Sequence, residues 1–310
     1  MLDRRRALTG LELVRLARAI DPDARPIGSE PLLGGLDWGT YAIDLETPSG
    51  RRSLVVRRHD GPADRAGDVA RRLWTVLTCL RDVELPIPRP ILFDDGRLLG
   101  APLVVMSRCP GAIRPPPAEP AAWTEGYADV VAAIQRVDPS RLAALPRCPD
   151  RRGEVERLVR RSADGRKGPE WQRLLDLLRG HLHPGADAAP VLRHRDLWFG
   201  NTLWKGDEVS GILDWSGACV GDPAGDLGYA RLDVHLVLGR DAARAFHAAV
   251  GDRVGPLPAT AWWELLAAAD GLAWMEEWVD GYQEVGVELI VPTARDRLGE
   301  FIDDAGSRLG

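Results

Sequence analysis

Three side chains between residues 196 and 214 combine residue types that can carry out phosphoryl transfer. Asp196 lies five positions before Asn201, and Asp214 follows a short apolar run. An asparagine carbonyl and an aspartate carboxylate are oxygen ligands that suit Mg²⁺. A further carboxylate at the same point can accept the proton of a hydroxyl group. The chemistry indicated is transfer of a phosphoryl group from a magnesium-bound nucleotide to an alcohol.

A predicted hairpin brings these side chains together. Two apolar runs between residues 202 and 213 are joined by a turn that contains glycine, a pattern typical of an antiparallel hairpin. Pairing Lys205 with Val209 places Asn201 opposite the residue that precedes Asp214. Because antiparallel neighbours lie ~4.5–5.5 Å apart, Asn201 and Asp214 are expected to converge on one ion.

The same stretch, residues 191–229, contains four motifs that together resemble a known family. They are His194-Arg195-Asp196, Asn201, Ile212-Leu213-Asp214-Trp215 and Gly221-Asp222-Pro223. They are similar to the motifs of the aminoglycoside phosphotransferase family, which shares the protein-kinase-like fold. The resemblance is expected to span about residues 30–300. It implies that Asp196 is the catalytic base, that Asn201 and Asp214 hold Mg²⁺, and that ATP or GTP is the donor.

Four neighbouring residues are predicted to support the site rather than to react. By the resemblance, His194 supports the loop 194–201. Asp222 precedes a proline, which predicts Asp222 as the N-cap of a helix that begins at residue 224. Asp226 is expected to brace the catalytic loop, through Arg195. The family commonly has glycine at the position of Arg195. Arginine at this position matches protein kinases instead.

The elements that must position these residues change in character along the chain. A helix is predicted at 2–20, followed by strands at 32–36, 41–45, 54–57, 91–93 and 103–106, with a helix at 64–82 among them. After the proline-rich segment 109–120, helices are predicted at 119–138, 151–162, 169–181, 224–238, 241–251, 258–284 and 293–305. Only the hairpin 202–214 interrupts them.

This order predicts an α+β, protein-kinase-like bilobal fold. Residues 1–108 form a nucleotide-binding lobe with a small antiparallel sheet and one main helix, after the leading helix 1–20. Residues 109–120 form the hinge, and 121–310 form a larger helical lobe that carries the site.

The first lobe carries the candidate nucleotide-binding residues. Gly34 and Gly35 lie in a loop between two predicted strands, where backbone N–H groups can approach phosphates. In kinase-like folds a lysine ends the third strand, and here that position is Arg57, which can also bind phosphate. Met106 and Ser107 lie at the predicted adenine-binding hinge.

In kinase-like folds that lysine usually pairs with a glutamate of the following helix. In this sequence the position of the glutamate is occupied by Leu73, on the apolar face of helix 64–82. The usual ion pair is therefore predicted to be absent. This absence is the main argument for a catalytically impaired pseudokinase.

Composition narrows the class of protein further. The 310 residues carry 40 basic and 46 acidic side chains, a net charge of −6, and only Lys167 and Lys205 are lysines. No basic face for nucleic acid is indicated, and no apolar run reaches the ~18 residues of a membrane span. The four cysteines are widely spaced and are predicted to be buried thiols rather than disulfides or a zinc site. These features indicate a cytoplasmic protein.

The acceptor is the least determined part. Family resemblance places carboxy-terminal helices around the acceptor, so Glu277, Asp280 and Trp274 are candidate contacts, although a solvated face and a core tryptophan explain them equally well. An aminoglycoside, a macrolide and a metabolite alcohol stay open as acceptors, as do a monomer and a homodimer.

Three functions therefore compete. The leading hypothesis is a small-molecule O-phosphotransferase, and the alternative is a nucleotide-binding pseudokinase that acts through partner contacts. A protein kinase is third, because only seven residues separate Asp214 from Asp222, too few for a regulated substrate platform.

Overall fold

The computed structural model describes residues 7–32, 39–59, 63–117, 119–163, 165, 167–182 and 188–309. The described residues form an antiparallel sheet followed by a mainly helical part, which confirms the predicted α+β class. The chain divides into two compact units, Met1–Pro110 (unit 1) and Gly111–Gly310 (unit 2). The predicted hinge, 109–120, spans this boundary.

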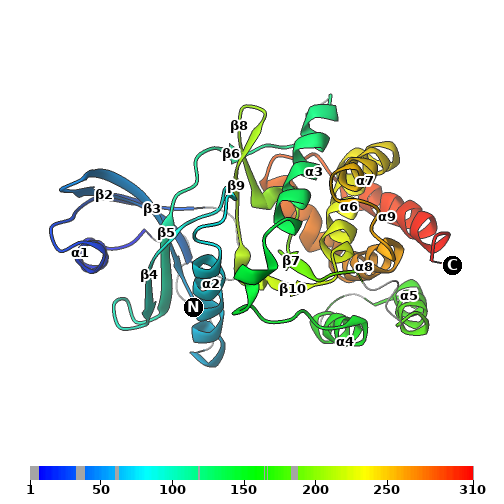
Figure 1. Cartoon of the computed structure of the whole chain (residues 1–310), viewed down its shortest axis with the longest axis horizontal. Helices are drawn as coiled ribbons and strands as arrows, with labels where there is room; N and C mark the ends of the chain where they lie inside the picture. The colour runs from blue at the N-terminus through cyan, green and yellow to red at the C-terminus, as the bar shows by residue number, and fades with distance from the viewer. Residues whose placement is uncertain are drawn as a thin grey trace. The chain divides into compact units, whose positions relative to one another are not determined.

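Unit 1 is built on five strands. They are β1 (Arg25–Pro31), β2 (Gly39–Thr47), β3 (Gly50–Arg58), β4 (Pro90–Asp95) and β5 (Pro102–Ser107). They pair antiparallel in the order β1-β2-β3-β5-β4 (Figure 1). In β3 the side chains alternate, so that Val56 and Arg58 are buried whereas Val55 and Arg57 are partly exposed.

The first strand differs from its predicted position. Prediction placed it at 32–36, of which 33–36 lie outside the described residues, whereas β1 occupies Arg25–Pro31. This segment has two prolines and little apolar periodicity, so its sequence does not indicate a strand. Pairing with the apolar strand β2 decides its conformation, and an edge position tolerates both prolines.

Two helices flank this sheet. Helix α1 (Gly10–Ile20) begins later than the predicted 2–20, because Thr9 and Glu12 form a capping box. Thr9 N donates to Glu12 Oε2 at 2.7 Å, and Glu12 N donates to Thr9 Oγ1 at 3.3 Å. Helix α2 (Ala63–Cys79) packs against β4 and β5 through an apolar face that includes the buried Leu73.

Unit 2 is mainly helical, and each of its helices overlaps one predicted from the sequence. They are α3 (Ala121–Gln135), α4 (Arg151–Arg161), α5 (Pro169–Gly180), α6 (Ala224–Leu238), α7 (Arg240–Val254), α8 (Thr260–Glu284) and α9 (Val291–Gly306). Helices α6 and α8 pack against each other, with most of their residues buried. They form the scaffold behind the candidate site.

Two small sheets complete unit 2. Strand β7 (Val191–Arg193) pairs with β10 (Cys219–Gly221), and β8 (Thr202–Lys205) lies between β6 (Ala112–Ile113) and β9 (Glu208–Ile212). The hairpin formed by β8 and β9 was predicted. Strands β6, β7 and β10 were not, because two or three residues carry no readable periodicity.

The register of the hairpin corrects one predicted pair and keeps another. Lys205 pairs with Glu208 rather than with Val209, and a bulge follows between Leu203 and Trp204. The bulge shifts the pairing by one residue, so that Thr202 lies opposite Ile212. Asn201 therefore still faces the residue before Asp214, as predicted, and its carbonyl accepts the Leu213 N–H at 2.8 Å.

The interpretation of all four cysteines as thiols is wrong for two of them. Cys148 and Cys219 form a disulfide across 71 positions of the chain, whereas Cys79 and Cys109 are free. Backbone hydrogen bonds already hold the two segments together, since Cys148 N donates to Val220 O at 2.9 Å. Tertiary pairing brings these distant residues side by side, which their spacing in the sequence does not reveal.

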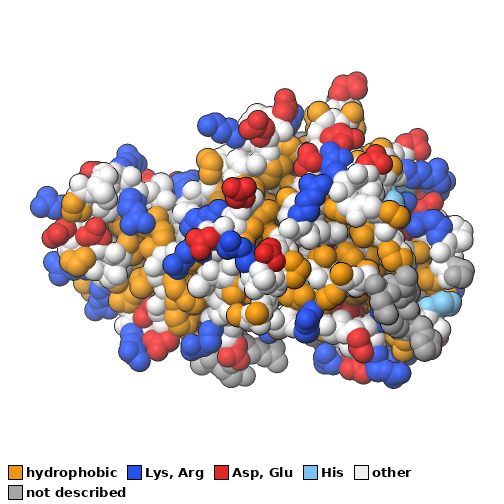
Figure 2. Space-filling model, in the orientation of Figure 1, with side chains coloured by type: hydrophobic (Ala, Val, Ile, Leu, Met, Phe, Trp, Pro, Cys, Tyr) orange, Lys and Arg blue, Asp and Glu red, His pale blue; other side chains and the backbone are white. Residues whose placement is uncertain are grey.

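Among the described residues, no helix has both the length and the apolar character needed to cross a bilayer. Over the face shown in Figure 2, arginines and acidic side chains are interspersed rather than gathered by sign.

Candidate active site

The loop between β7 and β8 brings Asp196 and Asn201 into direct contact. Asn201 Nδ2 donates to the backbone carbonyl of Asp196 at 2.8 Å and to its carboxylate Oδ2 at 3.1 Å. A short 3₁₀ turn, Phe199–Asn201, folds the chain back so that these two side chains meet. The amide nitrogen is therefore directed at Asp196, and the amide carbonyl oxygen is presented to the other side.

Asp214 follows β9 at the end of the same hairpin. Its backbone has a left-handed conformation, with φ of 56°, and its Oδ1 accepts a hydrogen bond from Ser216 Oγ at 2.8 Å. A left-handed residue with a Cβ is uncommon outside functional sites and tight turns. The turn directs the chain from β9 back towards β10.

Asp196 and Asp214 also interact electrostatically. The pKa of Asp196 is raised, first because surrounding protein atoms displace water from its carboxylate and second because Asp214 is negatively charged. The residue nevertheless keeps an exposed surface. Two acidic groups and one amide carbonyl thus gather at one accessible point of unit 2.

His194 is buried beneath this point. Its Nε2 lies 2.6 Å from the carbonyl oxygen of Leu213 and must donate to it, while Nδ1 accepts the Asp196 N–H at 3.3 Å. The ring also meets Trp215 edge-on, with centroids 4.6 Å apart. His194 therefore links the loop 194–201 to the end of the hairpin and does not face the accessible side.

Asp226, on α6, braces the first part of the loop through backbone groups. Its carboxylate accepts the N–H groups of His194 at 2.6 Å and Arg195 at 3.0 Å. The guanidinium of Arg195 contacts Glu154 instead, so the predicted link from Asp226 to Arg195 runs through the backbone.

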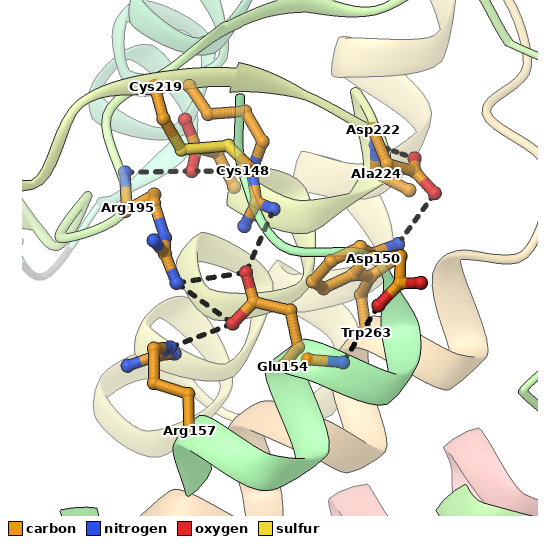
Figure 3. Close-up of polar contacts among 12 residues, drawn as sticks. Cys148, Asp150, Glu154, Arg157, Arg195, Cys219, Asp222, Ala224 and Trp263 are labelled. Carbon is orange, nitrogen blue, oxygen red and sulfur yellow. Dashed lines mark hydrogen bonds and ion pairs between the residues drawn. A yellow bond between two sulfur atoms is a disulfide. The ribbon is translucent and has the colours of Figure 1, made fainter. Parts of the chain in front are cut away.

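Asp222 lies close to the start of α6. The N-cap of this helix is Pro223, not Asp222, but the Asp222 carboxylate accepts the Ala224 N–H at 2.9 Å. Its other oxygen accepts the indole N–H of Trp263 at 2.9 Å (Figure 3). Asp222 thus joins the start of α6 to α8.

Asp233 braces the second part of the loop and was not predicted. Its carboxylate accepts the Phe199 N–H at 2.9 Å and the Tyr282 hydroxyl at 2.8 Å. The Tyr127 hydroxyl lies 3.4 Å from Asp233 and donates to Leu197 O at 3.1 Å. In the sequence, Asp233 was one acidic residue in a helix whose residues are buried on all sides, so periodicity could not single it out.

Burial raises the pKa of Asp233 to about 7. Because the folded state holds this proton more tightly than the unfolded state, the free energy of unfolding should fall as pH rises from about 4 to about 7. The contribution is up to about 1.4 kcal/mol per pH unit. Asp233→Asn should remove this part of the slope, as measured by urea unfolding at successive pH values. Identical slopes in the variant and the wild type would contradict the assignment.

The three residues predicted to contact the acceptor all lie on α8 but differ in their exposure. Glu277 and Asp280 are exposed, whereas Trp274 is half-buried at a kink in the helix, with φ of −130° and ψ of 24°. Contacts that join α8 to the loop 194–201 run through Tyr282, whose ring stacks on Phe199. The structure does not bring the three predicted residues together with Asp196 through any contact of the described residues.

In unit 1, the predicted nucleotide residues lie at the ends of two paired strands. Arg57, in β3, lies opposite Val104 of β5 and is partly exposed. Met106 is buried inside the sheet, and the Ser107 N–H donates to Arg89 O at 2.9 Å. Gly34 and Gly35 lie outside the described residues.

The donor set of unit 2 fits a magnesium ion. Mg²⁺ prefers carboxylate and carbonyl oxygens, keeps several waters and tolerates an open, accessible position. Asp214 supplies a carboxylate and Asn201 an amide oxygen directed away from its contact with Asp196. A divalent cation would also reduce the repulsion between Asp196 and Asp214.

Comparison with known proteins gives three findings. Residues 30–276 match the model of the phosphotransferase enzyme family. Over 178 residues the chain is 29% identical to viomycin phosphotransferase from Streptomyces vinaceus, 49% of this chain and 58% of that protein. Over 214 residues it is 27% identical to acyl-CoA dehydrogenase family member 10 from Mus musculus, 64% of this chain but 19% of that protein. The chain thus spans less than two thirds of either relative.

Solved structures share the fold at low identity. An aminoglycoside-3'-phosphotransferase of type VIII superposes with a TM-score of 0.57 at 22% identity, covering 84% of this chain and 98% of that chain. Macrolide 2'-phosphotransferase type I gives 0.59 at 20% identity, covering 98% and 99%. A ternary complex of an aminoglycoside phosphotransferase with AMP-PNP and hygromycin B gives 0.63 at 17% identity, covering 91% and 95%.

Proposed function

The chain belongs to the phosphotransferase enzyme family, and from this premise we propose that it transfers the terminal phosphoryl group of a nucleoside triphosphate to a hydroxyl group of a small molecule. The observation that carries the proposal is the convergence of Asp196, Asn201 and Asp214 at one accessible point of unit 2. A protein with no catalytic task has no physical need for two repelling carboxylates there.

Asp196 acts as the general base. It accepts the proton of the acceptor hydroxyl while the hydroxyl oxygen forms a bond to the γ-phosphorus. The bond from that phosphorus to the bridging oxygen breaks, and its electron pair leaves with the nucleoside diphosphate. His194, Asp226 and Asp233 hold the loop that carries Asp196 through the contacts described above.

Asn201 and Asp214 would hold Mg²⁺, which when bound supplies positive charge against the phosphate oxygens. In unit 1 we assign phosphate binding to Arg57 and base binding to the strand end at Met106 and Ser107. The donor is ATP or GTP. Because the reaction consumes a nucleoside triphosphate, we propose that the protein acts in the cytoplasm.

The acceptor is proposed from the relatives and the charge of the site. Viomycin phosphotransferase is a relative in sequence, and the fold is shared with aminoglycoside and macrolide phosphotransferases. Glu277 and Asp280 are exposed on α8 and suit a cationic acceptor. Viomycin, aminoglycosides and macrolides are therefore the first acceptors to test, followed by metabolite alcohols.

The test is a transfer screen with [γ-³²P]ATP and GTP, with and without Mg²⁺, over these acceptor classes. We expect a labelled acceptor in the presence of Mg²⁺ and at least about a hundredfold slower labelling with Asp196→Asn. Nucleotide binding without transfer to any acceptor would overturn the proposal. It would favour a nucleotide-binding pseudokinase, for which the specific observation is the buried Leu73 on α2.

The assignment of Arg57 is tested separately. Arg57→Ala should raise the KM for nucleotide about 10- to 150-fold, because one charge-assisted contact with phosphate is worth about 1.5–3 kcal/mol. Arg57→Lys should keep most of the affinity, since it retains the charge. Arg51→Ala, an exposed arginine of the same strand that pairs with Asp44 at 2.8 Å, serves as the control. Unchanged nucleotide affinity in Arg57→Ala would remove Arg57 from the site.

A further inference from the structure

Arg195 has a backbone conformation that its side chain does not favour. Its φ is 69°, in the left-handed region, and it directly precedes Asp196. Glycine adopts this region freely, whereas a residue with a Cβ adopts it only when the surroundings compensate. The direction in which Asp196 projects depends on this one backbone turn, so the compensating contact matters to the site.

The side chain of Arg195 is anchored on a buried carboxylate. Its Nη2 donates to both oxygens of Glu154, at 2.9 and 2.8 Å, and Glu154 is only 1% exposed (Figure 3). The backbone N–H of Arg195 donates to Asp226 on the opposite side. The residue is therefore held both by its side chain and by its backbone.

Glu154 is suited to act as an anchor because it lies on a helix that is itself fixed. Helix α4 starts at an N-cap, where Asp150 Oδ1 accepts the Gly153 N–H at 2.8 Å. The Cys148–Cys219 disulfide lies immediately before this cap and joins it to β10, the partner of the strand that leads into the catalytic loop. Figure 3 shows the disulfide, the cap and the carboxylate in one cluster.

Glu154 also neutralises other arginines of the cluster. Arg157 Nε donates to Glu154 Oε2 at 2.8 Å, and Arg193 Nη1 lies 3.8 Å from Oε1. A buried carboxylate surrounded by arginines is stable only as part of this set, since removing one charge leaves the others uncompensated. Arg157 belongs to α4 itself, however, so only Arg193 and Arg195 connect Glu154 to the catalytic loop and the strand before it.

We propose that Glu154 is a positioning residue of the catalytic loop, which acts through Arg195 to hold the left-handed turn from which Asp196 projects. The expected effect on kcat rests on the proposed function. The brace, meaning the contact of Glu154 with Arg195 that holds the turn, can be measured without turnover. Arg195 thus does with a side-chain anchor what glycine at this position does by conformational freedom.

The deciding comparison is Arg195→Ala against Arg195→Gly. Both remove the anchor, but only alanine keeps the unfavourable left-handed backbone. In hydrogen exchange, amides 194–199 should exchange about tenfold faster in Arg195→Ala than in the wild type, and within about threefold of the wild type in Arg195→Gly. The kcat should follow the same order, with the KM for nucleotide unchanged. Equal exchange and equal kcat in the two variants would overturn the proposal.

Glu154→Gln tests the anchor from the other side. It should lower kcat and loop protection about tenfold in the wild-type background and less in the Arg195→Gly background, because the turn there needs no anchor. Arg157→Ala is the matched control: it removes an arginine that contacts Glu154 from within α4, so it should lower Tm, while loop exchange changes by less than the tenfold expected for Glu154→Gln.

Each result bears on one claim. If Glu154→Gln lowers kcat and loop protection equally in the wild-type and Arg195→Gly backgrounds, coupling through Arg195 is refuted. If Glu154→Gln does not fold, the two Arg195 variants still decide. If the wild type transfers no phosphate but Arg195→Ala still exchanges faster than Arg195→Gly, the brace stands and the proposed function fails.

Discussion

Asp196→Asn is expected to lower kcat by about 10²–10⁴-fold, the usual contribution of a general base. Asparagine has nearly the same shape, so Asn201 can keep its contact with the backbone carbonyl of residue 196. The amide of the introduced asparagine cannot take up the proton of the acceptor hydroxyl group at neutral pH. The KM for nucleotide should stay within about threefold, since the loss falls on the chemical step.

Three measurements make this prediction specific to Asp196. Steady-state kinetics with an acceptor found in the transfer screen give kcat and KM. Thermal unfolding should show an unchanged or higher Tm, because the substitution removes a charge that Asp214 repels. Asp303→Asn, at an exposed position of α9, is the control for loss of an acidic group and should keep full activity. A variant at residue 196 with near wild-type kcat would show that another group is the base.

Reduction of the Cys148–Cys219 disulfide is expected to lower the free energy of unfolding by about 4 kcal/mol. In the chain-entropy model, a loop of 71 residues restricts the unfolded chain by about this amount. Equilibrium urea unfolding with and without dithiothreitol measures the effect. The midpoint should shift to lower urea concentration on reduction, with a larger m-value because the reduced unfolded chain is less compact.

The chain provides its own control for this experiment. A variant with Cys79→Ser and Cys109→Ser keeps only the two bridged cysteines, so its response to reductant reports on the disulfide alone. The variant with Cys148→Ser and Cys219→Ser should instead unfold at the same midpoint in both conditions. An identical midpoint with and without reductant in the first variant would show that no bridge forms in solution.

The sequence predicted most of the helices and the central hairpin because their signals are local. Apolar residues that recur at helical spacing mark α4, α5 and α9, whatever they pack against, whereas α6 is buried on nearly all sides. The hairpin is encoded in the same way, by two apolar runs and a glycine turn. The motif residues of the loop lie within a few positions of one another, so their proximity also follows from local structure.

The parts that were missed depend on contacts between distant segments. Strand β1 is a strand because β2 lies beside it, and β7 and β10 are too short to show a period. Cys148 and Cys219 are ordinary in the sequence and become a bridge only when β10 meets the segment before α4. The contact between α8 and the loop, made by Tyr282 on Phe199, likewise joins residues far apart in the sequence, whereas the acceptor contacts on α8 stay a prediction.

The sequence by itself determined which residues make up the candidate site: two carboxylates and an amide at spacings that a single hairpin brings together. Only the tertiary structure decided what holds these residues in place. Glu154 and Asp233 come from two helices, 42 and 37 residues away from Asp196 and on opposite sides of it in the chain. A carboxylate that will be buried cannot be told in the sequence from one that will be exposed. Its role is set by desolvation and by the hydrogen-bond donors around it, which come together only in the folded chain.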